Sequence, residues 1–454
     1  MSTTNLPLPP GPPGRLQLGN ARRMRKDEMS FYRGMVRDYG DIVRFRLGPF
    51  QANLVTHPNA IETVLVGRNH DVHKSPFYEA MGRVLGQGLL TSEDDFHRKQ
   101  RRLIQPMFHH KRIREYGESM VDYAVRYRDR WREGQELDFH EEMMALTLAI
   151  VGDTLFGADV ERDAPDVGRA MSAMLGTLDN IVVFLLFMIG GSAAERVEQL
   201  PLPSMRRFRT ARENLFGLIR RMMEEKRTEG AEGSDLLSRL LAVREEDGSA
   251  MSDQQILDEA ITIFLAGHET TAVALSWTFA LLARHPAVAE KLHAELDEVL
   301  GENVPTVDDL PRLDYTRRVL SESMRLFPPA WMIGRQAVAD MELLGYAVPK
   351  DTVLLLPPFF VQRDARWWPD PRRFDPDRWT PEQEAERPKY AYFPFGGGPR
   401  LCIGESFAWM EGELLLATIA QRWRPRLAEG YPKGLQPQVT LRPRDGMRMV
   451  MEPR

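Results

Sequence analysis

The stretch that decides the fold of this chain is Phe395-Gly396-Gly397-Gly398-Pro399-Arg400-Leu401-Cys402-Ile403-Gly404, which contains the single cysteine among 454 residues. The glycines and the proline before the cysteine allow a tight backbone bend and a close approach to a flat ligand. An apolar helical pattern follows, and a helix N-terminus favours the thiolate, the form that binds metals. The pattern therefore indicates that Cys402 is a presented ligand, and buried packing is the alternative.

The composition is that of an ordinary globular protein, because 43% of the residues are hydrophobic and the net charge is −5. This is ample for a sizeable core, and the lack of basic excess argues against nucleic acid as a partner. One cysteine excludes an internal disulfide and fits a reducing compartment, so we expect a cytoplasmic protein. The expected oligomeric state is a monomer. The organisation expected is a proline-rich segment over residues 1–15 and a single domain over 16–454.

Two apolar stretches resemble membrane spans but are better explained otherwise. Ile181 to Ile189 is much shorter than the roughly 20 residues that a spanning helix needs. Ala260 to Ala283 carries His268 and Glu269 at its centre, where a carboxylate is costly in lipid, so this segment is predicted to be a buried core helix. The residues before the proline strip lack the charged and apolar regions of a signal peptide, so we expect neither a signal peptide nor a transmembrane anchor.

Local patterns predict a fold that is mainly α with small β-sheets. Alternating apolar residues predict a hairpin over residues 42–55, and a second strand zone covers 335–356. The capping signature of Ser252 and Gln255, with Pro286 as a stop, predicts a helix of roughly 30 residues. Loop signals dominate from Pro357 to Pro399, and the last helix is expected to begin just after Cys402.

The sequence resembles the cytochrome P-450 family of haem-thiolate monooxygenases. The family's signature Phe-Gly-x-Gly-x-Arg-x-Cys-x-Gly is matched in full from Phe395 to Gly404. The resemblance covers nearly the whole chain and implies the cytochrome P-450 fold, with a long central helix over the haem. It also implies haem b as the cofactor, Cys402 as the iron ligand, and cofactor contacts from Phe395, Gly396 and Gly404.

A second family motif is Glu322-Ser323-Met324-Arg325, a Glu-x-x-Arg pattern that is uninformative alone because such pairs are common on solvated helices. It gains weight from Phe374-Asp375-Pro376-Asp377-Arg378-Trp379 further along. By resemblance, Glu322, Arg325 and Arg378 form a structural triad that fixes the loop around Cys402.

A third motif, Ala266-Gly267-His268-Glu269-Thr270-Thr271, lies in the middle of the long helix. A zinc protease motif would need histidine at the position of Ala272, so that class is excluded. The resemblance implies that Ala266 lies beside the cofactor, that Thr270 steadies bound dioxygen and that Glu269 relays protons. A threonine that bonds back to its own helix is the alternative.

The haem propionates need cationic partners, because buried carboxylates require charge-assisted hydrogen bonds. The resemblance implies that the candidates are His97, Arg101, Arg335 and Arg400. His97 stands where many family members have tryptophan. A basic run at Arg98, Lys99, Arg101 and Arg102 would, on the family's proximal surface, attract an acidic electron donor, although a plain solvated helix face has the same pattern.

The substrate pocket implied by the resemblance is uniformly apolar and has no charged partner for a ligand. This indicates a lipophilic substrate such as a fatty acid, terpenoid, steroid or polyketide. The positions are Phe77, Tyr78, Met81, Leu89, Leu90, Ile181, Phe184, Phe264, Ala330, Trp331, Met332, Ile333 and Leu441.

The activity expected from the resemblance is that of a monooxygenase, which inserts one atom of O2 into its substrate with electrons from a separate partner. Nothing in the sequence resembles a flavin or iron–sulfur domain, so a ferredoxin or flavodoxin with its reductase is the expected donor. Two alternatives remain: a peroxide-driven peroxygenase, and a non-enzymatic haem-thiolate sensor or ligand carrier.

Overall fold

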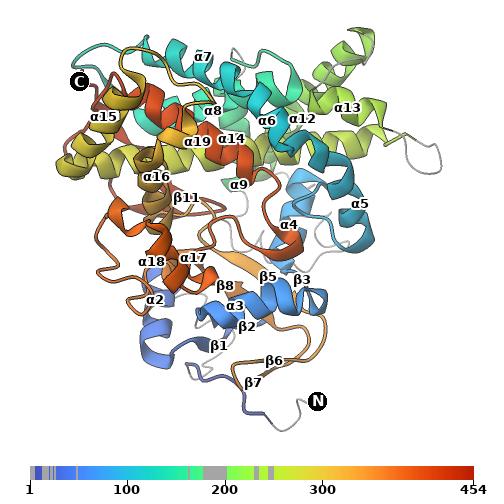
Figure 1. Cartoon of the computed structure of the whole chain (residues 1–454). Helices are drawn as coiled ribbons and strands as arrows, with labels where there is room; N and C mark the ends of the chain where they lie inside the picture. Colours follow the sequence, from blue (N-terminus) through green and yellow to red (C-terminus); the bar gives the residue numbers. More distant parts are fainter. Residues whose placement is uncertain are drawn as a thin grey trace. The chain divides into compact units, whose positions relative to one another are not determined.

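The computed structural model (Figure 1) describes residues 6–12, 20, 24, 27–47, 50–161, 164–176, 202–229, 235–243 and 250–454. The chain divides into two compact units, and it passes between them more than once. The first unit comprises Met1–Tyr78 and Met324–Cys402, and the second comprises Glu79–Ser323 and Ile403–Arg454. A single domain over residues 16–454 stays a prediction.

The first unit is built on a five-stranded sheet in the order β1-β2-β8-β5-β3. The pairs β1–β2, β5–β8 and β3–β5 are antiparallel, and β2–β8 is parallel. The predicted hairpin is confirmed, with Ile42 paired to Val55 and Leu47 to Phe50. The strands are β1 (Ile42–Leu47), β2 (Phe50–Val55), β3 (Val72–Lys74), β5 (Ile333–Ala337) and β8 (Val353–Leu356).

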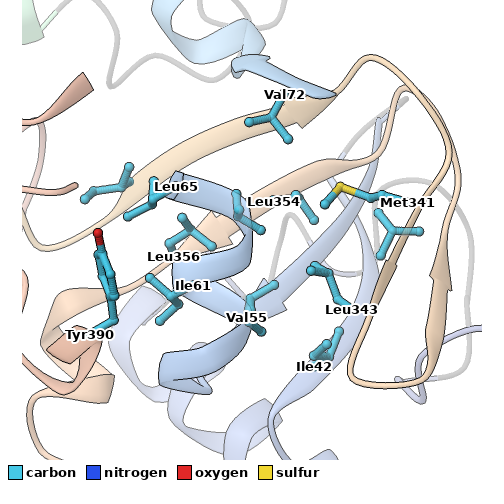
Figure 2. Packing of buried hydrophobic residues seen from close by; sticks show 14 of the residues in the cluster. Ile42, Val55, Ile61, Leu65, Val72, Met341, Leu343, Leu354, Leu356 and Tyr390 are labelled. Carbon is cyan, nitrogen blue, oxygen red and sulfur yellow. The ribbon is translucent and has the colours of Figure 1, made fainter. Parts of the chain in front are cut away.

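The core of the first unit lies between this sheet and the helical segment that follows β2. Figure 2 shows Ile61 and Leu65 beside Leu354 and Leu356, and all four side chains are buried. Burial of a side chain of this size stabilises the folded state by about 1.5–3 kcal/mol. The helices in the N-terminal part of the first unit are α2 (Glu28–Tyr39), α3 (Pro58–Glu62), the π-helical turn η2 (Thr63–Gly67) and η3 (Asn69–Asp71).

The rest of the first unit contains a small hairpin and the long segment before the cysteine. The described part of the proline strip adds backbone pairing, because the carbonyls of Pro7 and Pro10 accept hydrogen bonds from the amides of Ala347 and Arg44 at 2.9 and 2.8 Å. The segment predicted as loop holds several short helical turns. The elements are β6 (Met341–Leu343), β7 (Tyr346–Val348), α17 (Pro358–Val361), η7 (Pro376–Arg378), α18 (Pro381–Glu386), η8 (Lys389–Ala391) and η9 (Gly398–Arg400).

The second unit is mainly helical, and α4 and α16 each begin in one unit and end in the other. Its described helices are α4 (Pro76–Leu85), α5 (Asp94–Ile104), η4 (Gln105–Phe108), α6 (His110–Glu115), α7 (Gly117–Arg128), α8 (Phe139–Phe156), α9 (Ala164–Gly176), α12 (Pro203–Glu229), α13 (Leu236–Ala242), α14 (Asp253–Arg284), α15 (Pro286–Leu300), η6 (Leu310–Arg312), α16 (Asp314–Leu326) and α19 (Glu405–Ala420).

The central helix of the second unit is α14, which contacts α8, α12 and α19 (Figure 1). Its predicted limits are confirmed: Ser252 is the N-cap, its hydroxyl accepts a hydrogen bond from the Gln255 amide at 3.2 Å, and the helix ends at Arg284 before Pro286. Burial on nearly all sides explains why the sequence is apolar around the helix.

Two small sheets complete the second unit. They are β4-β12-β9 and β10-β11, formed by β4 (Glu136–Asp138), β9 (Arg426–Leu427), β10 (Leu435–Pro437), β11 (Leu441–Pro443) and β12 (Arg448–Val450). Within the described ranges, no single helix has the length and apolar character of a membrane span. The pair α14 and α15 reaches that threshold only when both are counted together, and the two meet at a bend of 111°.

Candidate active site

The cysteine loop of the first unit is a closed turn that exposes its thiol. The amide of Cys402 donates to the carbonyl of Phe395 at 3.1 Å, and the side chain of Cys402 is exposed. Gly398 has φ +65°, and a Cβ there would lie 1.9 Å from the carbonyl oxygen of Leu65. Only glycine fits this close approach. Because the thiol is exposed, the alternative of a buried packing cysteine is excluded.

The buried cation Arg335 is a second feature of the first unit. It lies in β5, opposite Lys74 of β3 and Leu354 of β8, and its side chain is buried. Its guanidinium donates to the carbonyl of Gly334 at 2.9 Å, and no acidic residue of the described ranges pairs with it. A buried charge needs a counter-ion, so Arg335 fits the carboxylate of a bound ligand. Arg400 is half-buried on η9, two residues before the cysteine.

Arg325 and Arg378 bind backbone carbonyls in the long segment that precedes the cysteine loop. Arg325 donates to the carbonyls of Gln362 at 2.8 Å and Pro371 at 2.9 Å, and Arg378 donates to that of Pro369 at 2.9 Å. Both arginines are buried, as is Glu322 three residues before Arg325 on α16. These bonds hold an irregular segment in one conformation, and the complete triad stays a prediction.

In the second unit, α14 has one open strip in an otherwise buried surface. From Ile256 to Leu282 every residue is buried except Ala266, Gly267 and Thr270, and Ala266 is the exposed member of the three. Ala266 and Thr270 are four residues apart and therefore share a helix face. Small residues are therefore accessible at the position where the family resemblance implies a cofactor.

The hydroxyl of Thr270 donates to the carbonyl of Ala266 at 2.8 Å, which is the back-bond left open as an alternative above. The bond uses the hydroxyl proton and leaves acceptor lone pairs available to a ligand or water. His268 is fully buried, and its Nδ1 lies 2.8 Å from the carbonyl of Phe264. Burial lowers the pKa of His268, so its ring is neutral at pH 7.

Glu269 is held in a buried ion pair. Its Oε1 lies 2.8 Å from both Nε and Nη2 of Arg442, and it accepts a hydrogen bond from the hydroxyl of Thr440. Burial raises the pKa of Glu269, but Arg442 and Thr440 outweigh this effect and hold the pKa below its usual value. The carboxylate is therefore ionised at neutral pH. Arg442 lies in β11, and Trp277 of α14 holds this strand against the helix by donating a hydrogen bond to the carbonyl of Leu441 at 2.8 Å.

The remaining predicted cofactor residues of the second unit lie on α5 and at the start of α19. His97 is buried and Arg101 is half-buried, and both lie on one face of α5. Gly404 is the N-cap of α19, so this helix begins just after Cys402 as predicted. In the first unit, Gly396 has φ +78° and lies beside Ile333. Roles for these residues and for Phe395 in binding a cofactor stay predictions.

The predicted substrate positions differ in exposure. Phe264 is fully buried and packs edge-on against Phe156 with ring centroids 5.2 Å apart. Ile181 and Phe184 lie outside the described residues. The buried positions are Met81, Leu89, Trp331, Ile333 and Leu441, and the half-buried ones are Phe77, Tyr78, Leu90, Ala330 and Met332.

Two features of the site were not found from sequence. One is the partnership of Arg442 and Thr440 with Glu269, which joins residues 173 and 171 positions apart. The other is Glu411 of α19, whose carboxyl group is fully buried; among the described residues neither of its oxygens has a partner at regular hydrogen-bond geometry, and the hydroxyl of Thr271 acts on it from α14. The sequence offered one hint of the burial of Glu411, namely an acidic residue within an otherwise apolar helical pattern.

The fold and the cysteine loop match what the sequence motifs predicted, and comparison with known proteins identifies the family. The family model "Cytochrome P450" matches residues 9–447, and the chain therefore belongs to the cytochrome P450 family. It is an enzyme of the monooxygenase class.

Relatives with known names support this assignment. The chain is 40% identical over 445 residues to cyclooctatin synthase of Streptomyces melanosporofaciens, covering 97% of this chain and 95% of the relative. It is 38% identical to cyclooctat-9-en-7-ol 5-monooxygenase of the same organism, covering 86% and 84%. It is 34% identical to pentalenene oxygenase of Streptomyces avermitilis, covering 90% and 89%.

Among solved structures, retinoic acid-bound cyanobacterial CYP120A1 has the same fold. The TM-score is 0.86 at 24% sequence identity, and the match covers 99% of this chain and 100% of that one. The predicted fold class is confirmed.

Proposed function

We propose that this chain binds haem b through the thiolate of Cys402 and inserts one oxygen atom of O2 into a lipophilic substrate of the terpenoid type. The observation that carries the proposal is the exposed thiol of Cys402 in a closed glycine loop that matches the family signature in full. When bound, a thiolate-ligated haem supplies the electron donation that favours cleavage of the O–O bond.

The residues present fit such a cofactor. Cys402 would hold the iron, and the backbone of Phe395 and Gly396 would approach the ring without a side chain in the way. Arg335 is a buried cation without an acidic partner in the described ranges, which suits a propionate. His97, Arg101 and Arg400 are the other candidates for propionate contacts, and Ala266 is an accessible small residue on α14.

Thr270 and Glu269 are proposed to help deliver protons to the site where dioxygen binds. Thr270 donates its hydroxyl proton to Ala266, so its oxygen can accept a hydrogen bond from water or from a bound ligand. Glu269 is ionised because of Arg442, so as a relay it would take a proton from water and pass it on in the same step. The ion pair returns it to the ionised form between turnovers.

The substrate class rests on the relatives and on the apolar character of the predicted pocket residues. One relative is named for the alkenol cyclooctat-9-en-7-ol, and another is named for pentalenene, whose name is that of an alkene. Both kinds of molecule are lipophilic and carry no charge, in agreement with a pocket that offers no charged partner. Electrons would come from a ferredoxin or flavodoxin with its reductase.

The test of the central assignment is the difference spectrum of the reduced protein with carbon monoxide. We expect the strong red shift that marks thiolate ligation in wild-type protein and its loss in Cys402→Ala and Cys402→His, with unchanged far-UV circular dichroism. A haem-loaded Cys402→Ala variant that retains the shift would overturn the proposal. Turnover of a panel of cyclic alkenes and alkenols with a ferredoxin and its reductase then tests the substrate class.

A further inference from the structure

The loop over residues 86–92, which joins α4 to α5 and carries Leu89 and Leu90, is bonded to α14 by two consecutive carboxylates. Asp258 Oδ2 accepts from the amide of Gln87 at 2.7 Å, and Glu259 Oε2 accepts from the amide of Leu89 at 2.8 Å. A buried carboxyl oxygen that accepts from a backbone amide is costly to leave without that bond. The loop backbone is therefore fixed by side chains of the central helix.

Two glycines bring the loop close enough for these bonds. Gly86 has φ +84°, and a Cβ there would lie 2.2 Å from the carboxylate of Asp258. A Cβ on Gly88 would lie 2.2 Å from Oγ1 of Thr262, one turn further along α14. Thr91 closes the loop on itself, since its hydroxyl donates to the carbonyl of Gly86 at 2.7 Å. A larger residue at position 86 or 88 would push the loop away from the helix.

Both carboxylates are buried and held in place from the preceding turn of α14. Gln254 Nε2 donates to Asp258 Oδ1 at 2.7 Å, and Gln255 Nε2 donates to Glu259 Oε1 at 3.0 Å. Gln255 Nε2 also lies 3.1 Å from the carbonyl of Gln87, so it joins helix and loop directly. Asp258 is 5% exposed and Glu259 is fully buried. These hydrogen bonds form one buried network that holds the loop against α14. Moving the loop would leave buried polar groups without partners, which is costly.

We propose that Asp258 and Glu259 are positioning residues for substrate selectivity. By fixing the amides of Gln87 and Leu89, they set where the side chains of Leu89 and Leu90 stand and hence which apolar shapes the enzyme accepts. This inference rests on the proposed function, in which Leu89 and Leu90 contact the substrate. Neither carboxylate takes part in the chemistry itself.

The test uses the haem-loaded enzyme and two probes, imidazole and 4-phenylimidazole, which share the iron-binding nitrogen and differ in apolar bulk. The variants are Asp258→Asn, Glu259→Gln and Glu259→Ala. The matched control is Asp253→Ala, which removes an exposed carboxylate from the first turn of the same helix, where it pairs with Arg227 and not with the loop. The measurements are spectral dissociation constants and amide hydrogen exchange of residues 86–92.

In Glu259→Ala we expect amide exchange in residues 86–92 to be at least about tenfold faster than in wild type. The preference for 4-phenylimidazole over imidazole should change by about fivefold or more, while the dissociation constant for imidazole stays within about twofold. Asp258→Asn and Glu259→Gln keep an acceptor oxygen and should show intermediate changes, which keeps the test open if the alanine variant fails to fold. Asp253→Ala should match wild type.

Loop exchange that is unchanged in all three variants would overturn the proposed bonds. Faster exchange with an unchanged preference between the two probes would reduce Asp258 and Glu259 to a purely structural role and would also overturn the proposal. If wild-type protein bound neither probe with a spectral shift, the haem assignment itself would fail, and that result is distinct from both.

Discussion

At the scale of single residues, the ion pair of Glu269 and Arg442 involves the residue next to Thr270 in the sequence. Replacing Arg442 by Met leaves the buried carboxyl group of Glu269 without its cation, so it stays as an unpaired charge or takes up a proton at a cost. We expect this to lower the free energy of unfolding by about 3–5 kcal/mol, as for other buried pairs that lose one member. Urea unfolding followed by circular dichroism measures the change.

The control for this pair is the double variant Glu269→Gln with Arg442→Met, which removes both charges together. It should recover most of the lost stability, because no uncompensated charge remains. A single variant Arg442→Met that loses less than about 1 kcal/mol would show that the ion pair is not held in the folded protein.

Glu411 differs from Glu269, whose pKa is lowered, because burial raises the pKa of Glu411 to about 8. The hydroxyl of Thr271 on α14 lowers the pKa in part, but burial dominates. A carboxyl whose pKa is higher in the folded than in the unfolded state stabilises the fold when it is protonated. This contribution is complete below about pH 4.5 and is lost as the pH rises toward about 8, at roughly 1.4 kcal/mol per pH unit.

The measurement is the stability of wild type minus that of Glu411→Gln as a function of pH. The amide side chain of this variant does not titrate, so the difference should fall by about 2–3 kcal/mol between about pH 5.5 and 7.5. A flat difference for Glu411→Gln would show that this group is ionised in the folded protein.

At the scale of elements, Gly398 decides how the cysteine loop packs on η2. A Cβ at this position meets the backbone carbonyl of Leu65 at 1.9 Å, and backbone atoms cannot move aside cheaply. We expect Gly398→Ala to cost about 2 kcal/mol or more of stability, from the left-handed φ and the clash together, and to lower the haem content per polypeptide.

The matched control is Gly345→Ala in the turn between β6 and β7. Gly345 also has a left-handed φ of +80°, but nothing lies within 4 Å of its added Cβ. It should cost only the conformational strain of about 1 kcal/mol and leave haem content unchanged. Equal effects of the two substitutions would refute the packing argument for Gly398.

The elements also show what sequence reasoning can and cannot reach. The limits of α14 were predictable because Ser252 and Pro286 act on neighbouring backbone, and the hairpin of β1 and β2 was predictable from alternation. The partners of Glu269 and the bonds from Asp258 and Glu259 to residues 87 and 89 were not predicted. They join positions more than 160 apart in sequence, and no local pattern records such a pairing.

At the scale of the whole molecule, charge distribution matters more than net charge. The chain carries −5 overall, yet Arg98, Lys99 and Arg102 are exposed together on α5. Such a basic face attracts an acidic donor over a distance of about one Debye length, roughly 10 Å at 0.1 M salt. We therefore expect the rate of reduction by an acidic ferredoxin to fall steeply as ionic strength rises.

Reversing two of these charges, with Lys99→Glu and Arg102→Glu together, should lower that rate by about tenfold or more at low salt and leave it nearly unchanged at high salt. Lys291→Glu is the control, because Lys291 is exposed and belongs to α15, a helix of the same unit that lies on the other side of that unit from α5 in Figure 1. Stopped-flow reduction under carbon monoxide measures all three proteins. If Lys291→Glu slowed reduction as much as the double reversal, the attraction would come from overall charge, and α5 would lose its assigned role.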